Sequence, residues 1–189
     1  MEALSSNFLL IFFAFSLITL SIQARESNTL FIRNSCSSTT YPRLCYASLV
    51  KHVNFIQSNR VLLTSTALNV TLASAKSTSA FMSTLSRSRG LKPREAAAIE
   101  DCVEVLSDSL EELRRSIGEM SRLRASNFEP TISDVQTWVS AALTDQSTCT
   151  DGLQEINAKD NIQTIVRGKI VQVAQLTSNA LALINKLAN

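Results

Sequence analysis

Four cysteines that follow an apolar leader constrain the fold of this chain more than any other feature. They are Cys36, Cys45, Cys102 and Cys149. An even number of cysteines in an exported chain predicts disulfides, because the extracellular compartment is oxidising. Four cysteines allow about three pairings, so the fold has to bring one of these sets together.

The leader predicts export. Residues 7–22 form an apolar run that is too short for a comfortable membrane span, and Ala24 offers a small residue for cleavage. We expect residues 1–24 to be a signal peptide and the protein to be secreted to the extracellular space, the apoplast or cell wall, with no membrane segment after cleavage. The leader contains Glu2 and no basic residue, so its removal raises the formal charge slightly above +2. The basic residues are scattered, which argues against nucleic-acid binding.

Helical periodicity fills the rest of the chain. Glycine and proline number only four and three, too few for the turns of a β protein. Four segments between residues 58 and 188 carry apolar residues at intervals of three and four, as one face of a helix requires. We therefore expect an all-α fold in which residues 58–189 form an up-down-up-down four-helix bundle. The third helix is expected to open with a capping box formed by Thr131 and Asp134.

Residues 25–57 do not follow this pattern and predict an N-terminal α-hairpin extension. Its helical pieces are expected near residues 29–34 and 42–53, on either side of a turn at Tyr41-Pro42. A disulfide between Cys36 and Cys45 would link the hairpin. Cys102 lies early in one predicted helix and Cys149 late in the next, and antiparallel neighbours place such positions side by side. The helix pattern therefore favours the pairs 36–45 and 102–149.

Few residues suit catalysis. His52 is the only histidine, and we expect it to be an exposed surface residue. With the cysteines used in disulfides, no cluster of metal ligands remains, so we expect no metal and no cofactor. Trp138 lies on an apolar stripe and is expected in the core. The chain is therefore predicted not to be an enzyme and to act by binding.

Two polar stripes are candidates for a binding surface. Asp101, Glu104, Asp108 and Glu111 recur along one predicted helix, and Thr137, Ala141, Thr144, Thr148 and Asp151 along the next. A disulfide between residues 102 and 149 would bring Glu104 and Asp108 close to Thr148 and Asp151. The same stripes could be ordinary solvated helix faces. Separately, Asn69-Val70-Thr71 is a sequon that predicts N-glycosylation at Asn69.

Four segments then carry a recognisable combination of residues. They are residues 36–45 (CSSTTYPRLC), 99–113 (IEDCVEVLSDSLEEL), 134–152 (DVQTWVSAALTDQSTCTDG) and 176–184 (LTSNALALI). Together they resemble the plant invertase and pectin methylesterase inhibitor family, over the whole chain that follows the leader. The resemblance implies a four-helix bundle with a disulfide-linked N-terminal hairpin, which agrees with the periodicity.

The third segment looks like the pectin methylesterase inhibitor branch. The invertase branch often ends in Pro-Lys-Phe, a tripeptide that this sequence lacks. The resemblance implies a 1:1 complex in which bundle helices cover the pectin-binding cleft of the esterase. Carried over by position, the contacts are Glu104, Asp108, Glu111, Thr148 and Asp151.

Two alternatives stay open: an inhibitor of acid invertase, and a helical carrier of a small ligand or lipid.

The acidic stripe also predicts a pH dependence. If its carboxylates raise one another's pKa, one of them could bind the esterase in its protonated form and donate a hydrogen bond. Because that contact is lost on deprotonation, affinity for the esterase should fall between about pH 5 and about pH 8.

Overall fold

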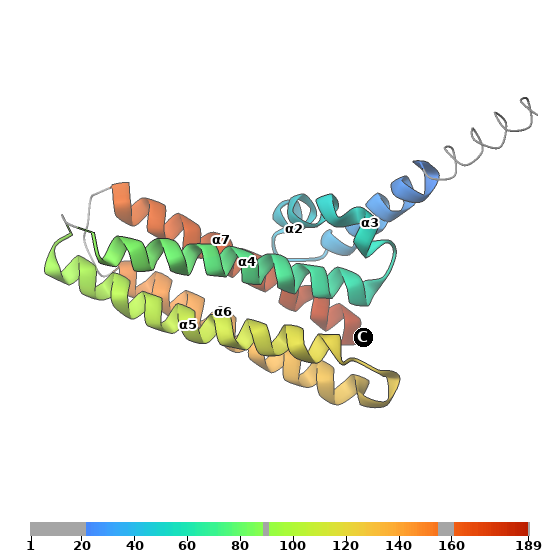
Figure 1. The fold of residues 1–189 in the computed structure, drawn as a ribbon. Helices are drawn as coiled ribbons and strands as arrows, with labels where there is room; N and C mark the ends of the chain where they lie inside the picture. Colours follow the sequence, from blue (N-terminus) through green and yellow to red (C-terminus); the bar gives the residue numbers. More distant parts are fainter. Residues whose placement is uncertain (1–21, 89–90, 155–160, 189) are drawn as a thin grey trace, which may run out of the picture.

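The computed structural model describes residues 22–88, 91–154 and 161–188, and no β-strand occurs in these ranges (Figure 1). The long helices are α4 (Arg60–Ser86), α5 (Pro93–Ser121), α6 (Phe128–Gln154) and α7 (Asn161–Ala188). Helix α4 packs against α5, α5 against α6, α6 against α7, and α7 against α4. This closed ring of neighbours confirms the predicted up-down-up-down bundle.

The hairpin precedes α4. Residues 22–36 are helical, and after a turn α2 (Pro42–Leu49), a 3₁₀ turn (Val50–His52) and α3 (Val53–Ile56) follow. The structure confirms the turn before Pro42, but it divides the helix expected over residues 42–53. The predicted signal peptide lies almost wholly outside the described residues. None of the described helices is long and apolar enough to cross a bilayer.

Local capping explains where the bundle helices begin. The side chain of Asn59 accepts a hydrogen bond from the Leu62 amide at 3.0 Å, which caps α4. Pro93 occupies the first turn of α5, and the backbone N–H of Lys92 donates to Glu95 Oε2 at 3.0 Å.

The predicted start of α6 is wrong. Asn127 Oδ1 accepts a hydrogen bond from the Arg124 amide at 2.6 Å and closes a 3₁₀ turn (Ala125–Asn127). The α-helix therefore begins one turn earlier than expected, at Phe128. Thr131 is buried inside the helix and does not form the predicted cap at its start.

The buried face of α4 is rich in threonine. Thr64, Thr66 and Thr71 are buried, and their hydroxyls donate to the carbonyls four residues earlier at 2.9, 2.6 and 2.8 Å. Because these bonds satisfy the hydroxyls within the helix, the threonine methyl groups can pack in the core. This explains why the apolar pattern of α4 is weak in the sequence although the helix is central.

The hairpin shares its core with the bundle. Ile32, Leu49, Val53 and Ile56 belong to one apolar cluster with side chains of α4, α5, α6 and α7. The buried side chain of Asn179 on α7 adds two hydrogen bonds to the hairpin: it accepts from the Tyr41 amide at 2.9 Å and donates to the Tyr41 carbonyl at 3.0 Å. The hairpin is thus attached to the bundle by packing and by a reciprocal amide contact, while its disulfide links its own two arms.

Both predicted disulfides are confirmed. Cys36 is bonded to Cys45, with their Cα atoms 5.6 Å apart. Cys102 is bonded to Cys149, with their Cα atoms 4.7 Å apart. The second disulfide lies in an apolar cluster with Leu106 and Ile170, away from the hairpin end of the bundle. It fixes how α5 and α6 are aligned along their lengths.

Candidate partner-binding face

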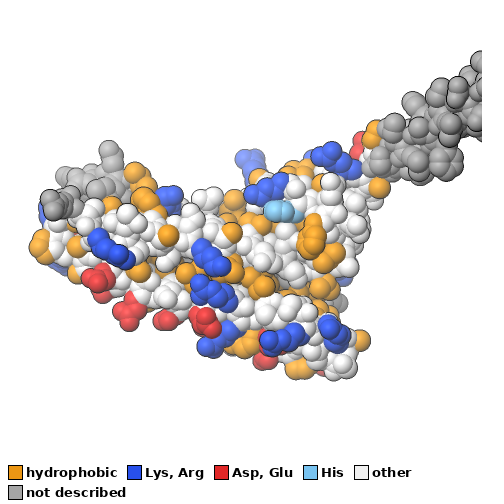
Figure 2. All heavy atoms as spheres, viewed as in Figure 1, with side chains coloured by type: hydrophobic (Ala, Val, Ile, Leu, Met, Phe, Trp, Pro, Cys, Tyr) orange, Lys and Arg blue, Asp and Glu red, His pale blue; other side chains and the backbone are white. Residues whose placement is uncertain are grey.

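We call the surface formed by two neighbouring helices the α5–α6 face. Its members are exposed side chains: Asp101, Glu104, Asp108 and Glu111 on α5, and Thr137, Thr144, Thr148 and Asp151 on α6. Figure 2 shows acidic side chains in a row along the edge of the bundle that α5 forms. All five predicted contact residues are therefore accessible and lie on two helices that pack together.

Only some of these residues lie near one another where α5 meets α6, a boundary that we call the seam. Asp101, Val105, Thr148 and Gly152 line a shallow groove of about 340 Å³ beside the Cys102–Cys149 disulfide. Asp101, rather than Glu104, therefore lies beside Thr148. Gly152, rather than Asp151, completes that wall of the groove.

Glu111 interacts with basic side chains of its own helix. Its carboxylate lies 3.3 Å from Arg115 Nε and 3.8 Å from Arg114 Nη1. These exposed pairs contribute little to stability, but they add two cations to the end of the acidic stripe. The face is therefore mixed in charge at both ends, because Arg94 lines the groove together with Asp101, and Arg114 and Arg115 lie beside Glu111.

Two carboxyl groups that sequence reasoning missed lie on the seam. Burial raises the pKa of Glu112 above its usual 4.5, and the neighbouring charges of Asp145 and Asp108 raise it further. Burial, and then the charge of Asp108, raises the pKa of Asp145 above its usual 3.8. One signal was available, because Asp145 lies four residues before Cys149 and therefore on the same side of α6.

A buried polar pair lies beneath these carboxyls. Gln146 Nε2 donates to Ser109 Oγ at 2.8 Å, and Ser109 Oγ donates to the Ala142 carbonyl at 3.2 Å. Within the described part of the chain, Glu112 Oε2 and Gln146 Oε1 are buried without a hydrogen-bond donor. The seam therefore contains unsatisfied acceptors, and an oxygen without a donor does not stabilise the charged form of Glu112.

Five exposed hydroxyl groups of α6 are satisfied within the helix. Thr137, Ser140, Thr144, Ser147 and Thr148 each donate to the carbonyl four residues earlier, at 2.7 to 3.1 Å. The α6 side of the face is thus polar in composition, but its hydroxyl protons are already used.

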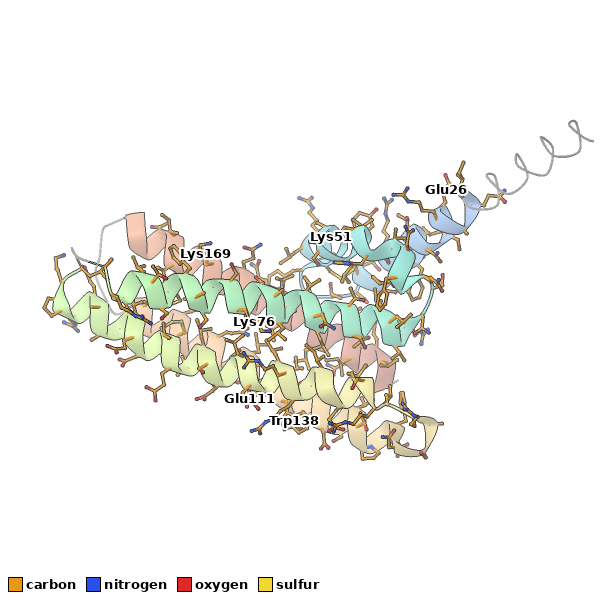
Figure 3. All side chains as sticks on the ribbon, viewed as in Figure 1. Glu26, Lys51, Lys76, Glu111, Trp138 and Lys169 are labelled. Atoms are coloured by element: carbon orange, nitrogen blue, oxygen red, sulfur yellow. A yellow bond between two sulfur atoms is a disulfide. The ribbon has the colours of Figure 1, made fainter. Side chains whose placement is uncertain are left out.

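Two expectations about single residues are wrong. Trp138 is half-buried on α6 and is not one of the core cluster residues; Figure 3 labels it on the same edge of the bundle as Glu111. His52 is half-buried and lines a groove beside the hairpin instead of lying free on the surface. In the ranges that the structure describes, no group of three or more His, Cys, Asp or Glu is placed to hold a metal ion.

The fold defines a disulfide-linked helical bundle with an N-terminal hairpin. The family described as plant invertase/pectin methylesterase inhibitor matches residues 30–183, and the chain belongs to that family. Members of the family are inhibitors and not enzymes.

Named relatives are similar along most of the chain. Pectinesterase inhibitor 9 from Arabidopsis thaliana is 40% identical over 100% of this chain and 96% of its own length. Pectinesterase inhibitor 10 from the same plant is 44% identical over 89% of this chain, which spans 54% of that protein. A crystal structure of a mutant form of a pectin methylesterase inhibitor from Arabidopsis has a TM-score of 0.65 at 23% identity, covering 79% of this chain and 92% of that one. This last likeness concerns the fold.

Proposed function

We propose that this protein is a secreted inhibitor of pectin methylesterase that covers the substrate cleft of the esterase with the α5–α6 face. The observation that carries the proposal is the α5–α6 face itself, held in alignment by the Cys102–Cys149 disulfide. The family and the pectinesterase inhibitor relatives support the target. Inhibition of acid invertase is the alternative within the family, and the family assignment favours inhibition over a ligand carrier.

The inhibitor would act by occlusion in a 1:1 complex in the cell wall. Carboxylates accept hydrogen bonds, so Glu104, Asp108 and Asp151 would meet donors at the rim of the cleft, and Thr148 would contact the rim beside the groove that it lines with Asp101. Arg114 and Arg115 beside Glu111 would meet acidic groups. Trp138, half-buried on α6, is the kind of aromatic residue that often anchors an interface.

The test measures two enzymes side by side. Purified protein is mixed with a pectin methylesterase at its working pH and, separately, with an acid invertase, and residual activity is titrated. We expect stoichiometric loss of esterase activity and unchanged invertase activity. Loss of invertase activity alone would overturn the choice of target in favour of the alternative.

A single substitution tests the face. Replacing the exposed Asp108 by Ala should weaken esterase inhibition by about 1–3 kcal/mol if its hydrogen bonds are buried in the complex. The matched control is Glu129→Ala, an exposed carboxylate in the first turn of α6, where inhibition should be unchanged. If Asp108→Ala inhibits as the parent does while circular dichroism shows it folded, the α5–α6 face is not the interface.

A further inference from the structure

A surface groove lies where the hairpin meets the bundle, on a side of the molecule that the proposed inhibition does not use. Its volume is about 790 Å³, and it is lined by residues of α2, α3, α4 and α7, including Leu44, Phe55, Val70 and Leu176. Phe55 on α3 is 62% exposed, which is unusual for so large an apolar side chain. In Figure 2 the pale-blue imidazole of the only histidine lies among hydrophobic and basic side chains in this region.

The sequon lies on the wall of this groove. Asn69 is exposed on α4 and lines the groove together with Phe55. Its Nδ2 donates to the Ser65 carbonyl at 2.8 Å. A glycosylated Nδ2 keeps one hydrogen, so this bond can persist after modification. The attachment atom and the exposed aromatic ring therefore border the same hollow.

We propose that Asn69 carries an N-linked glycan whose first N-acetylglucosamine lies in this groove against Phe55. The donor is a polyprenyl-pyrophosphate-linked oligosaccharide of the secretory pathway. A bond forms between Asn69 Nδ2 and C1 of the sugar, the bond from C1 to the pyrophosphate oxygen breaks, and polyprenyl pyrophosphate leaves with the electron pair. The amide proton is released. Transfer takes place on the extended chain, before α4 forms.

The lining of the groove matches the two sides of this sugar. The C–H face of a pyranose ring is apolar and carries a small positive charge, which suits the negative face of the Phe55 ring. Lys51, His52 and Gln172 also line the groove and supply polar groups for the hydroxyl and acetamido groups. Figure 3 shows Lys51 on the hairpin, above α4.

The glycan would connect α3 to α4 and so hold the hairpin on the bundle. It would also cover Phe55, an exposed apolar side chain of the kind that promotes association between proteins. The inference rests on the proposed export of the chain and does not depend on inhibition of the esterase. The two can therefore fail separately.

The first experiment asks whether the site is used. The chain with its leader is expressed in a eukaryotic secretory host that makes high-mannose glycans, and the intact mass of the secreted protein is measured. We expect one glycan, absent from Asn69→Gln and from Thr71→Val and present in Thr71→Ser. Thr71→Val suits this purpose because the Thr71 hydroxyl bonds only within its own helix, to the Ala67 carbonyl. Secreted protein without a glycan overturns the inference, whatever its effect on the esterase.

The second experiment asks where the first sugar lies. Endoglycosidase H trims the glycan to one N-acetylglucosamine, and this form is compared by thermal unfolding with unglycosylated protein from bacteria. We expect the single sugar to raise Tm by roughly 2–4 °C, the shift that follows from about 1 kcal/mol in a chain of this size. In Phe55→Ser the same comparison should give no difference.

A matched control uses Leu30→Ser, another exposed apolar residue that does not line this groove. Here the sugar should raise Tm as it does in the parent. If the sugar has the same effect with and without the Phe55 ring, or has no effect in the parent, the glycan does not lie in the groove.

Discussion

Glu112 shows how burial and charge combine at one residue. Its carboxyl lies on the α5–α6 seam, where partial burial, Asp145 and Asp108 all favour the protonated form and raise its pKa. Arg115 opposes this shift, but as a smaller effect than burial and Asp145. Because Asp108 acts on both Glu112 and Asp145, one exposed carboxylate influences two half-buried ones.

The raised pKa values predict how stability depends on pH. A carboxyl whose pKa is higher in the folded state binds more protons there, so the free energy of unfolding falls as pH rises. The fall should begin near the ordinary values of 3.8 and 4.5 and end above the raised pKa of each group. We expect Glu112→Gln to reduce this slope and to stabilise the protein at neutral pH by up to about 1 kcal/mol, since solvent screens a half-buried group.

Urea unfolding followed by circular dichroism at several pH values between about 4 and about 8 measures this slope. Glu129→Gln, at an exposed carboxylate, is the control and should leave the slope unchanged. Asp108→Asn should move the fall to lower pH, because it removes a charge that raises both pKa values. A Glu112→Gln variant whose stability depends on pH as that of the parent does would contradict the assignment of Glu112.

At the scale of single elements, one side-chain amide of α7 contributes to holding the hairpin on the bundle. Asn179→Ala would leave the Tyr41 amide and carbonyl without their side-chain partner, and we expect it to lower the free energy of unfolding by about 1–3 kcal/mol. Hydrogen exchange should then rise first in residues 41–49, ahead of the bundle. Ser178→Ala removes only an exposed bond of 3.2 Å to Thr40 and should change stability by less than about 0.5 kcal/mol.

The helices differ in how much of them the sequence could predict. The stripe of α5 is apolar and regular, and Ile99, Leu106, Leu113 and Met120 are buried as expected. Helix α4 has a weak stripe because its buried threonines satisfy their hydroxyls within the helix, which a hydropathy pattern records as polar. The start of α6 was misplaced because Asn127 forms the turn before the helix. Asn127 itself is not followed three residues later by the Glu or Gln that predicts a capping box.

The candidate face could be predicted only as two stripes. Periodicity places Asp101, Glu104, Asp108 and Glu111 on one helix. It does not predict how far that helix is rotated about its axis relative to α6. In the structure Asp101 and Thr148 line the same groove, while Glu111 pairs with arginines of its own helix. Glu112 and Trp138 could not be placed for the same reason. Both are half-buried, and the periodicity of a single helix distinguishes only a buried face from an exposed one.

At the scale of the whole molecule, the two disulfides constrain chain segments of very different length. Loop closure predicts about 4 kcal/mol for the Cys102–Cys149 bond, which spans 47 residues, and about 2.6 kcal/mol for Cys36–Cys45, which spans 9. Replacing Cys102 and Cys149 by Ala should therefore destabilise more than replacing Cys36 and Cys45. It should also weaken esterase inhibition, because α5 and α6 lose their fixed alignment. Denaturant titration and the inhibition assay check both; a larger loss of inhibition for the Cys36/Cys45 variant would contradict this order.

The satisfied hydroxyls of α6 have a consequence for any molecule that lands on the face. Since Thr144 and Thr148 direct their protons to their own helix, the outward surface of these side chains is largely methyl. Removing water from methyl groups is favourable in free energy, whereas removing water from carboxylates is costly. Association at α6 should thus be accompanied by release of loosely held solvent and by a negative change in heat capacity, even though the sequence of this helix reads as polar.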